Sequence, residues 1–166
     1  MRGYFRTFFL IVFYVALCKE ILKAKDFASY EVTDGDTIVF IRGKGNRERI
    51  RLEGIDAPEM KQPCLTEGKA CGELSKSYLK SLTSSDLYCE ISGRDKYKRG
   101  LGTCFSKGIN LNKVMVKQGY AVAYVYYTKI YEEDEREAKR SKKGLWKYGF
   151  KNPSQFRKEK KNTVQS

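Results

Sequence analysis

The pattern of apolar and polar positions changes along the chain, and each pattern predicts a different element. Two short runs of strand-forming residues, at 38–41 and 49–52, flank the turn-forming stretch 43–46, which predicts a pair of strands. From Thr66 onwards the apolar positions recur every fourth residue, so this segment predicts a helix. The positions on its apolar face are Ala70, Leu74, Tyr78 and Leu82.

The second half of the chain continues this mixture of short elements. Residues 87–91 and 101–105 predict two strands that flank a loop, and 122–127 predicts another extended segment. Helices are predicted at 110–118 and at 129–143, because each of these segments is followed by a glycine, which commonly ends a helix. Short strands interrupted by helices predict an α+β fold, with a small closed barrel of the oligonucleotide-binding type and helices beside it.

The N-terminal segment differs in composition from the rest of the chain. Two arginines precede an uninterrupted apolar run at 8–18, which is shorter than the ~20 residues of a membrane-spanning helix. We therefore expect a signal peptide within residues 1–24 and an exported protein, secreted or periplasmic. Residues 16–18 are one candidate cleavage site and Ala24 is another. The alternative is an uncleaved membrane anchor formed by residues 7–18.

The charge of the chain is strongly positive. The formal net charge is +13, and +10 of it lies beyond residue 24. Such an excess attracts polyanions, but it does not distinguish nucleic acid from an anionic membrane or an acidic glycan. Alternatively, the positive charge only keeps the protein soluble and binds no specific partner. We expect the polar and basic segment 151–166 to be a flexible tail that follows a domain at 25–150.

Four cysteines follow the N-terminal segment, and an even number favours disulfides in an oxidising compartment. Their spacing does not match the short Cys-x-x-Cys pairs of structural zinc sites, and the chain has no histidine. Three pairings are open, of which we expect Cys64–Cys71 and Cys89–Cys104. A hairpin centred at 96–97 would place the second pair on opposite strands within disulfide reach.

The absence of histidine also limits the chemistry that the chain can perform. It excludes the usual nucleophilic triads, most catalytic zinc sites and acid–base catalysis by imidazole. Carboxylates, arginines and a hard divalent cation remain as the means of catalysis.

Three acidic or basic clusters could supply these groups, at 34–37, 56–59 and 95–100. Taken singly, the first is an ordinary Asp-Gly turn, the second a polar loop shaped by Pro58, and the third an exposed hairpin loop. Taken together, they place carboxylates for a divalent cation and arginines for phosphate at strand ends, where loops can converge.

These clusters also carry a resemblance to a known family. The stretches 32–38, 51–59 and 95–101 resemble three ordered signatures of the staphylococcal nuclease (thermonuclease) family, and the similarity extends over roughly residues 30 to 147. The cysteines resemble those of an exported, disulfide-bearing branch of the family. Lys98 departs from the family pattern, which often has glycine there. The resemblance implies a five-stranded barrel with about three packed helices.

The resemblance further implies a role for each residue of the clusters. Asp36 and Asp56 would be calcium ligands together with the backbone carbonyl of Ala57, and Asp34 would shape the metal loop. Glu59 would hold the attacking water. The implied phosphate ligands are Arg51 and Arg99, and the implied nucleotide-binding residues are Lys96, Tyr97, Tyr124 and Tyr126.

We therefore expect calcium-dependent hydrolysis of phosphodiester bonds in DNA and RNA, with little sequence preference. Calcium is expected rather than magnesium, because it suits a flexible site of carboxylates and carbonyls and is abundant outside cells. The family resemblance implies products with 3′-phosphates. A non-catalytic nucleic-acid-binding module on the same fold is the first alternative, and a membrane-associated structural or adhesion protein is the second. We expect a monomer, and the sequence indicates no protein partner.

Overall fold

The computed structural model describes residues 20–66, 68–126 and 128–165. The described strands are β1 (Glu20–Lys23), β2 (Ser29–Asp34), β3 (Thr37–Ile41), β4 (Arg47–Leu52), β5 (Ile55–Asp56), β6 (Tyr88–Arg94), β7 (Gly100–Ser106), β8 (Ile109–Asn110) and β9 (Val122–Ala123). The α-helices are α1 (Cys71–Leu82), α2 (Leu111–Lys117), α3 (Glu132–Arg140) and α4 (Pro153–Gln165).

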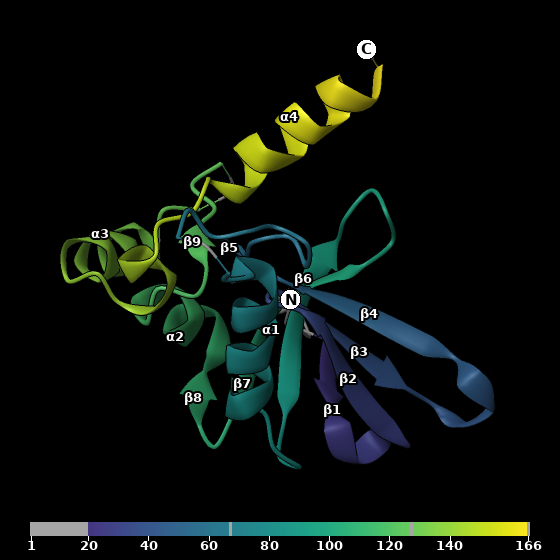
Figure 1. Ribbon diagram of the computed structural model, residues 1–166. Helices are drawn as coiled ribbons and strands as arrows, with labels where there is room; N and C mark the ends of the chain where they lie inside the picture. Colours follow the sequence, from purple (N-terminus) through teal and green to yellow (C-terminus); the bar gives the residue numbers. More distant parts are fainter. Residues whose placement is uncertain (1–19, 67, 127, 166) are drawn as a thin grey trace, which may run out of the picture.

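Seven of the strands form one curled sheet in the order β1-β6-β7-β4-β3-β2, with β8 paired to β7 (Figure 1). All neighbours are antiparallel except β4 and β7, which run parallel. The short strands β5 and β9 form a separate antiparallel pair. Helix α1 lies against the sheet, and α2 and α3 lie to one side of it (Figure 1).

The core lies between this sheet and the helices. β3 is buried over four consecutive residues, and its Ile38 and Phe40 are completely inaccessible. Leu79 of α1 and Met115 of α2 pack into the same apolar cluster from the helical side. Each element thus turns its apolar face inward and leaves its ends, where the polar clusters lie, at the surface.

The predicted fold class is confirmed: the chain has an α+β, oligonucleotide-binding-like fold. The sheet is an open, curled half-barrel, because no pairing joins its edge strands β1 and β2 among the described residues. Helix α1 begins at Cys71 rather than Thr66. Pro63 and Ala70 form an isolated β-bridge, and the Cys64–Cys71 disulfide ties the segment before the helix back onto its first turn.

Both expected disulfides are present. Strands β6 and β7 form the predicted hairpin, in which Cys89 lies opposite Cys104 and is bonded to it. The second disulfide joins Cys64 to Cys71. All four cysteines are buried, so the disulfides lie inside the packed structure.

The two ends of the chain differ from a simple leader and tail. Residues 1–19 of the expected leader lie outside the described residues, but Glu20–Lys23 form β1, which pairs with β6 and buries Leu22. At the other end, within the segment 151–166 that was expected to be a flexible tail, Pro153–Gln165 form helix α4. None of the helices in the described part of the chain is long and apolar enough to cross a bilayer.

Candidate active site

A cleft of about 700 Å³ lies where the three polar clusters meet. Its walls come from the β2–β3 turn, the end of β4 with the segment after it, the β6–β7 hairpin and helix α4. The predicted site residues that line it are Asp34, Asp36, Arg51, Asp56, Ala57, Glu59, Lys96, Tyr97, Arg99 and Tyr124. Segments as far apart as 34 and 157 in the sequence therefore contribute to one cavity.

The β2–β3 turn fixes the position of Asp36. The side chain of Asp34 accepts a hydrogen bond from the Asp36 backbone N–H at 3.0 Å, and Asp36 accepts one from the Ala57 N–H at 2.7 Å. Gly35 lies so close to α1 that a Cβ atom there would be 1.9 Å from the hydroxyl oxygen of Ser75. Only glycine fits this approach, so the turn is held against the helix with its carboxylates facing the cleft.

Asp36 is a buried carboxylate among other negative charges. Its burial raises its pKa to about 7, against the lowering effect of the nearby Arg51 guanidinium. The charges of Asp34 and Asp56 raise the pKa further. A cation placed among these carboxylates would favour their ionised forms, so the site has the electrostatic character of a cation-binding position.

Arg51 links the first two clusters. Its guanidinium lies 2.9 Å from a carboxylate oxygen of Asp36 and donates a hydrogen bond of 3.0 Å to Asp56. Strand β4 carries this arginine and pairs with both β3 and β7, so its backbone is fixed from two sides. Arg51 is therefore a rigidly placed positive group at the centre of the acidic cluster.

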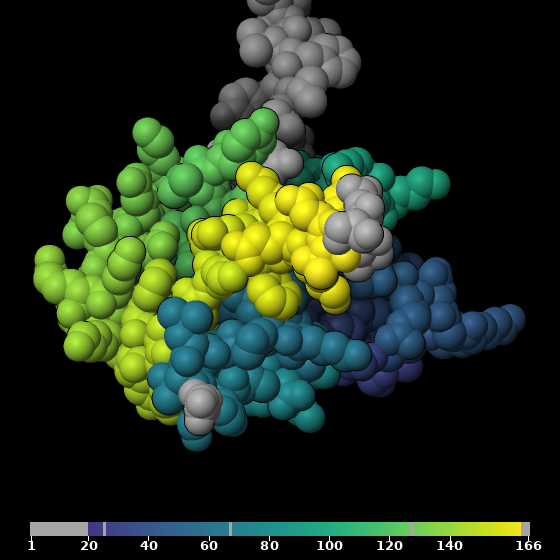
Figure 2. Space-filling model, turned by 45° about the horizontal axis from the view of Figure 1, so that its top comes forward, coloured from purple at the N-terminus to yellow at the C-terminus, as the bar shows by residue number. Residues whose placement is uncertain are grey.

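A second arginine, which the sequence did not indicate, reaches the same carboxylates from α4. Arg157 donates hydrogen bonds to both carboxylate oxygens of Asp56, at 3.1 and 2.8 Å, and to Glu59 at 2.8 Å. Burial acts to lower the pKa of Arg157, but its bonds to these two carboxylates outweigh that effect and raise it. Figure 2 shows α4 (yellow) lying across the face of the molecule beside the blue segment that follows β5.

Glu59 lies on a loop that is held by a buried amide. Gln62 is completely inaccessible; it accepts a hydrogen bond from the Glu59 N–H at 3.2 Å and donates one to the Lys151 carbonyl at 2.6 Å. The same loop rests on α1 at Gly72, where a Cβ atom would be 1.9 Å from the Glu59 carbonyl oxygen. The loop is thus fixed both to α1 and to the segment that leads into α4.

The β6–β7 hairpin holds Arg99 through Asp95. One oxygen of Asp95 accepts from the backbone N–H groups of Tyr97 and Arg99, and the other accepts from the Arg99 guanidinium at 2.8 Å. Burial tends to raise the pKa of Asp95, but these hydrogen bonds lower it overall. Lys96 and Arg99 both approach the Tyr97 ring, at 5.1 and 5.6 Å from its centroid.

The two predicted tyrosines differ in position. Tyr124 lines the cleft, and its backbone N–H donates to the Gly54 carbonyl at 2.8 Å. Tyr126 is not among the lining residues; it is 82% exposed, with its ring centroid 6.3 Å from that of Tyr124. It lies at the surface beyond the cleft wall rather than in the cavity.

The cleft is suited to a hard cation by its donors. Asp34, Asp36, Asp56 and Glu59 supply carboxylate oxygens. Arg51 pairs with Asp36 and Asp56, and Arg157 pairs with Asp56 and Glu59. Within the described ranges no three His, Cys, Asp or Glu side chains are already grouped to hold a metal ion. Both oxygens of Asp56 face Arg157, so a metal ligated there requires that this guanidinium move away.

Some of these positions could have been found in the sequence and others could not. Asn152-Pro153 is a helix-start signal, because Pro suits the first helical position and the Asn152 side chain accepts the Ser154 N–H at 3.0 Å. Asp95 belongs to the third cluster, although no role was expected for it. No local pattern marks Arg157 or Gln62, because their roles depend on contacts across the fold.

Comparisons with known proteins identify similar chains. Residues 49–148 match the family model described as staphylococcal nuclease homologue. The chain is 39% identical over 123 residues to the succinoglycan biosynthesis protein ExoI of Rhizobium meliloti (strain 1021), covering 70% of this chain and 62% of that protein. It is 35% identical to an uncharacterized endonuclease of Haemophilus influenzae (79% and 72% covered) and 33% identical to a micrococcal nuclease of Shigella flexneri (80% of each).

Proposed function

Because the chain belongs to the family of staphylococcal nuclease homologues, we propose that it is a nuclease that hydrolyses phosphodiester bonds of both DNA and RNA with calcium as its cofactor. The observation that carries this proposal is the meeting of buried carboxylates and arginines from three separate segments in one cleft. A module that only bound nucleic acid would gain nothing from buried carboxylates beside an anionic backbone.

Arg51 and Arg99 are the proposed ligands of the scissile phosphate. A phosphodiester gains negative charge as water adds to phosphorus, and a guanidinium fork stabilises that charge through two parallel hydrogen bonds. Arg51 is fixed by two carboxylates and Arg99 by Asp95, so both forks are oriented before substrate arrives. Lysine would supply the charge without this geometry.

The proposed calcium ligands are the carboxylates of Asp36 and Asp56 and the backbone carbonyl of Ala57. Calcium takes oxygen ligands of these kinds, and when bound it would offset the phosphate charge and help to orient water. Asp34 supports the site through the turn, because its side chain holds the Asp36 backbone N–H.

Glu59 is the proposed group that orients the attacking water and accepts its proton. Its side chain is 45% exposed at the edge of the cleft, so water can reach it. In the present arrangement the carboxylate is bonded to Arg157, and it becomes available to water when that bond opens. The proton moves from water to the carboxylate as the new P–O bond forms. The P–O bond to the 5′ oxygen of the leaving sugar breaks, and that oxygen takes up a proton from solvent water, leaving a 3′-phosphate and a 5′-hydroxyl.

The rest of the cleft suits a nucleotide without base-specific readout. Lys96, Tyr97 and Tyr124 line it, and Tyr126 lies at the surface close to Tyr124. Stacking on aromatic rings and contact with backbone charge are tolerant of sequence, which supports the proposal of little sequence preference.

We further propose that the protein acts outside the cytosol. Two buried disulfides are typical of proteins that fold in an oxidising compartment, and they support export. Mass spectrometry of the protein from the culture medium and cell fractions would show whether the apolar N-terminal segment is removed.

Plasmid DNA and a long RNA, each incubated with calcium, magnesium or chelator, test the proposed function. We expect cleavage of both substrates with calcium and none with chelator. Arg51→Ala should lower the cleavage rate by about 10²-fold or more, because it removes charge stabilisation from the transition state. Arg49→Ala, which removes an exposed arginine from the same strand, is the matched control. Binding without cleavage in calcium would refute the proposal.

A further inference from the structure

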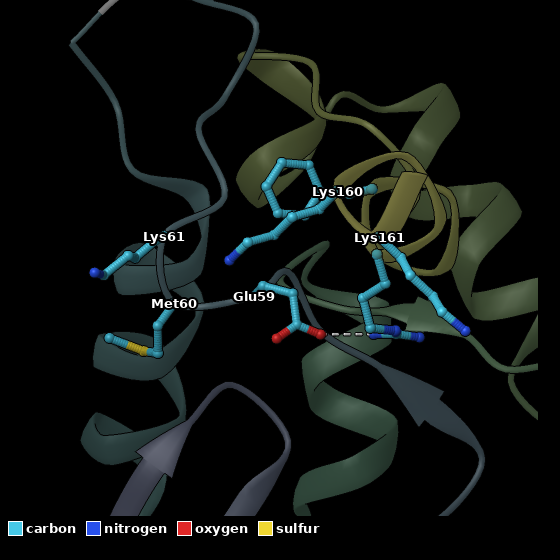
Figure 3. Close-up of a pocket in the computed structure, with 7 residues that line it drawn as sticks. Glu59, Met60, Lys61, Lys160 and Lys161 are labelled. Carbon is cyan, nitrogen blue, oxygen red and sulfur yellow. Dashed lines mark hydrogen bonds and ion pairs between the residues drawn. The ribbon is translucent and has the colours of Figure 1, made fainter. Parts of the chain in front are cut away.

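A second pocket lies next to the cleft, between α4 and the loop that carries Glu59. Its volume is about 500 Å³, and its lining residues are Glu59, Met60, Lys61, Phe156, Arg157, Lys160 and Lys161 (Figure 3). Glu59 and Arg157 line the cleft as well. The pocket is therefore a lateral continuation of the candidate active site, with α4 as its outer wall.

The pocket has a basic rim. Lys160 extends from α4 toward the segment that bears Glu59, whereas Lys61 and Lys161 point outward on opposite sides (Figure 3). All three are exposed, and within the described part of the chain none of their ammonium groups has a carboxylate partner. The unpaired ammonium group of Lys160 over the cavity, with two further lysines at the rim, favours an anionic occupant.

The pocket also offers an aromatic surface. Phe156 comes from the first half of α4 and is one of the residues that line the cavity. A half-buried phenyl ring in a basic pocket is unusual for a purely electrostatic surface. It is the arrangement that lets a nucleobase stack while the adjoining phosphates meet lysines.

The walls are held firmly enough to form a binding site. Gln62 joins the Glu59 loop to the Lys151 carbonyl just before α4, and Lys151 itself pairs with Glu159 of the helix. Pro153 is buried, and Arg157 fixes the next turn of the helix to Asp56 and Glu59. In the metal-free protein, contacts at both the start and the middle of α4 thus set its distance from the loop, and those at its start do not involve the carboxylates of the cleft.

We propose that this pocket is an accessory subsite for single-stranded nucleic acid, which binds one nucleotide beyond those in the cleft. This inference rests on the proposed function and names a further part of its substrate site. Phe156 stacks on the base, and Lys160 contacts an adjoining phosphate. A single strand fits because its bases are free to stack on a protein ring, whereas those of a duplex are stacked on one another.

Nucleic acid suits the pocket better than an anionic membrane does. The pocket is concave and opens into the cleft through Glu59 and Arg157, so a strand held in the cleft would pass into it. A membrane requires a broad apolar face with several large side chains, whereas Phe156 lines a cavity whose other lining residues are mostly charged.

Binding of a fluorescent single-stranded oligonucleotide in chelator tests the subsite without requiring cleavage. The apparent affinity is measured by anisotropy over a range of salt concentrations. For single strands the slope of log affinity against log salt is about −0.7 per phosphate contact. Lys160→Ala should make this negative slope shallower by about 0.7, whereas Lys61→Ala, which removes a lysine that points outward at the rim, should change it less. Lys158→Ala, which removes an equal charge from α4 outside the pocket, is the control and should leave the slope unchanged. Equal effects of all three variants would indicate diffuse attraction and overturn the subsite.

Phe156→Leu tests stacking separately from charge. Affinity for the oligonucleotide should fall about 5- to 100-fold, as expected for the loss of one base–aromatic contact, and affinity for an abasic strand of equal length should not change. An equal loss for both strands would show that the ring supports only the helix, and an unchanged affinity for both would show that it has no role. Either result overturns the stacking assignment.

Two parallel measurements separate the possible failures. Wild-type cleavage of plasmid and RNA with calcium tests the proposed function alone, because it does not depend on the pocket variants. Absence of cleavage, together with the predicted binding changes, would leave the subsite standing and refute the nuclease mechanism. Vesicles with anionic lipid provide the other arm: loss of vesicle binding in Lys160→Ala, with oligonucleotide binding intact, would assign the pocket to a membrane and overturn the proposal.

Discussion

Replacing Arg157 by glutamine should increase the affinity of the protein for calcium. Arg157 engages both carboxylate oxygens of Asp56 and one of Glu59. If Asp56 ligates calcium as proposed, the ion has to displace this guanidinium, and the free energy of the displaced contacts is subtracted from the binding free energy. Glutamine keeps much of the side-chain length but removes the charge and the fork.

The size of the effect follows from the exposure of the groups. The side chain of Asp56 is 2% exposed, whereas Arg157 and Glu59 are 42% and 45% exposed. Exposed ion pairs contribute about 0–1 kcal/mol, so we assign little to the Glu59 contact. The bidentate contact of Arg157 with buried Asp56 contributes about 1–2 kcal/mol, a value reduced because solvent surrounds part of the guanidinium. The dissociation constant for calcium should therefore fall about 5- to 30-fold.

Calorimetric titration of the metal-free protein with calcium measures this directly and needs no substrate. Lys158→Gln is the matched control, because it removes a neighbouring positive charge that does not touch the carboxylates. In chelator, Arg157→Gln should also lower the free energy of unfolding by about 1–2 kcal/mol, because Asp56 loses a partner. A calcium affinity equal to that of the wild type, or weaker, would show that Arg157 does not compete for the site.

Two further predictions concern the elements that support the site. Gln62→Met should lower the free energy of unfolding by about 1–3 kcal/mol in urea denaturation, because it leaves the Glu59 N–H and the Lys151 carbonyl without their buried partner. It should also lower kcat. An unchanged kcat would mean that Glu59 does not need this anchor. A chain that begins at Lys25 should be less stable than one that begins at Glu20 by about 2 kcal/mol or more, because it lacks β1 and buried Leu22. Coincident urea transitions of the two chains would contradict this. A large difference in stability would favour signal-peptide cleavage at 16–18 over cleavage at Ala24.

The features that the sequence predicted well are those with local causes. The β6–β7 hairpin follows from two strand-forming runs around a polar loop, and its register places Cys89 opposite Cys104. The three clusters converge because each lies at the end of a strand: two at ends of the curled sheet, and the third after β5, which directly follows β4. Helices α2 and α3 lie within the segments whose pattern predicted them.

The features that the sequence did not predict depend on distant contacts or on competing local forces. The helix expected from Thr66 begins only at Cys71, because the bridge between Pro63 and Ala70 holds the preceding segment extended. Tyr126 was expected beside Tyr124 in the pocket, but the extended alternation on which that depended ends after the two residues of β9. Strand β1 was not predicted, because Glu20–Lys23 lie within the segment that was expected to be a signal peptide.

Helix α4 lies outside the three family signatures, yet it contributes to the active site because its Arg157 is a partner of Asp56. A nearly inaccessible carboxylate needs a positive partner, and Arg51 is already shared between Asp56 and Asp36. Four carboxylates around one guanidinium would repel one another in the metal-free protein, so the Arg157 contact stabilises the folded site before any cation binds. The same contact ties up Glu59. Whichever cation occupies Asp56, guanidinium or calcium, therefore also decides whether Glu59 can accept a proton from water.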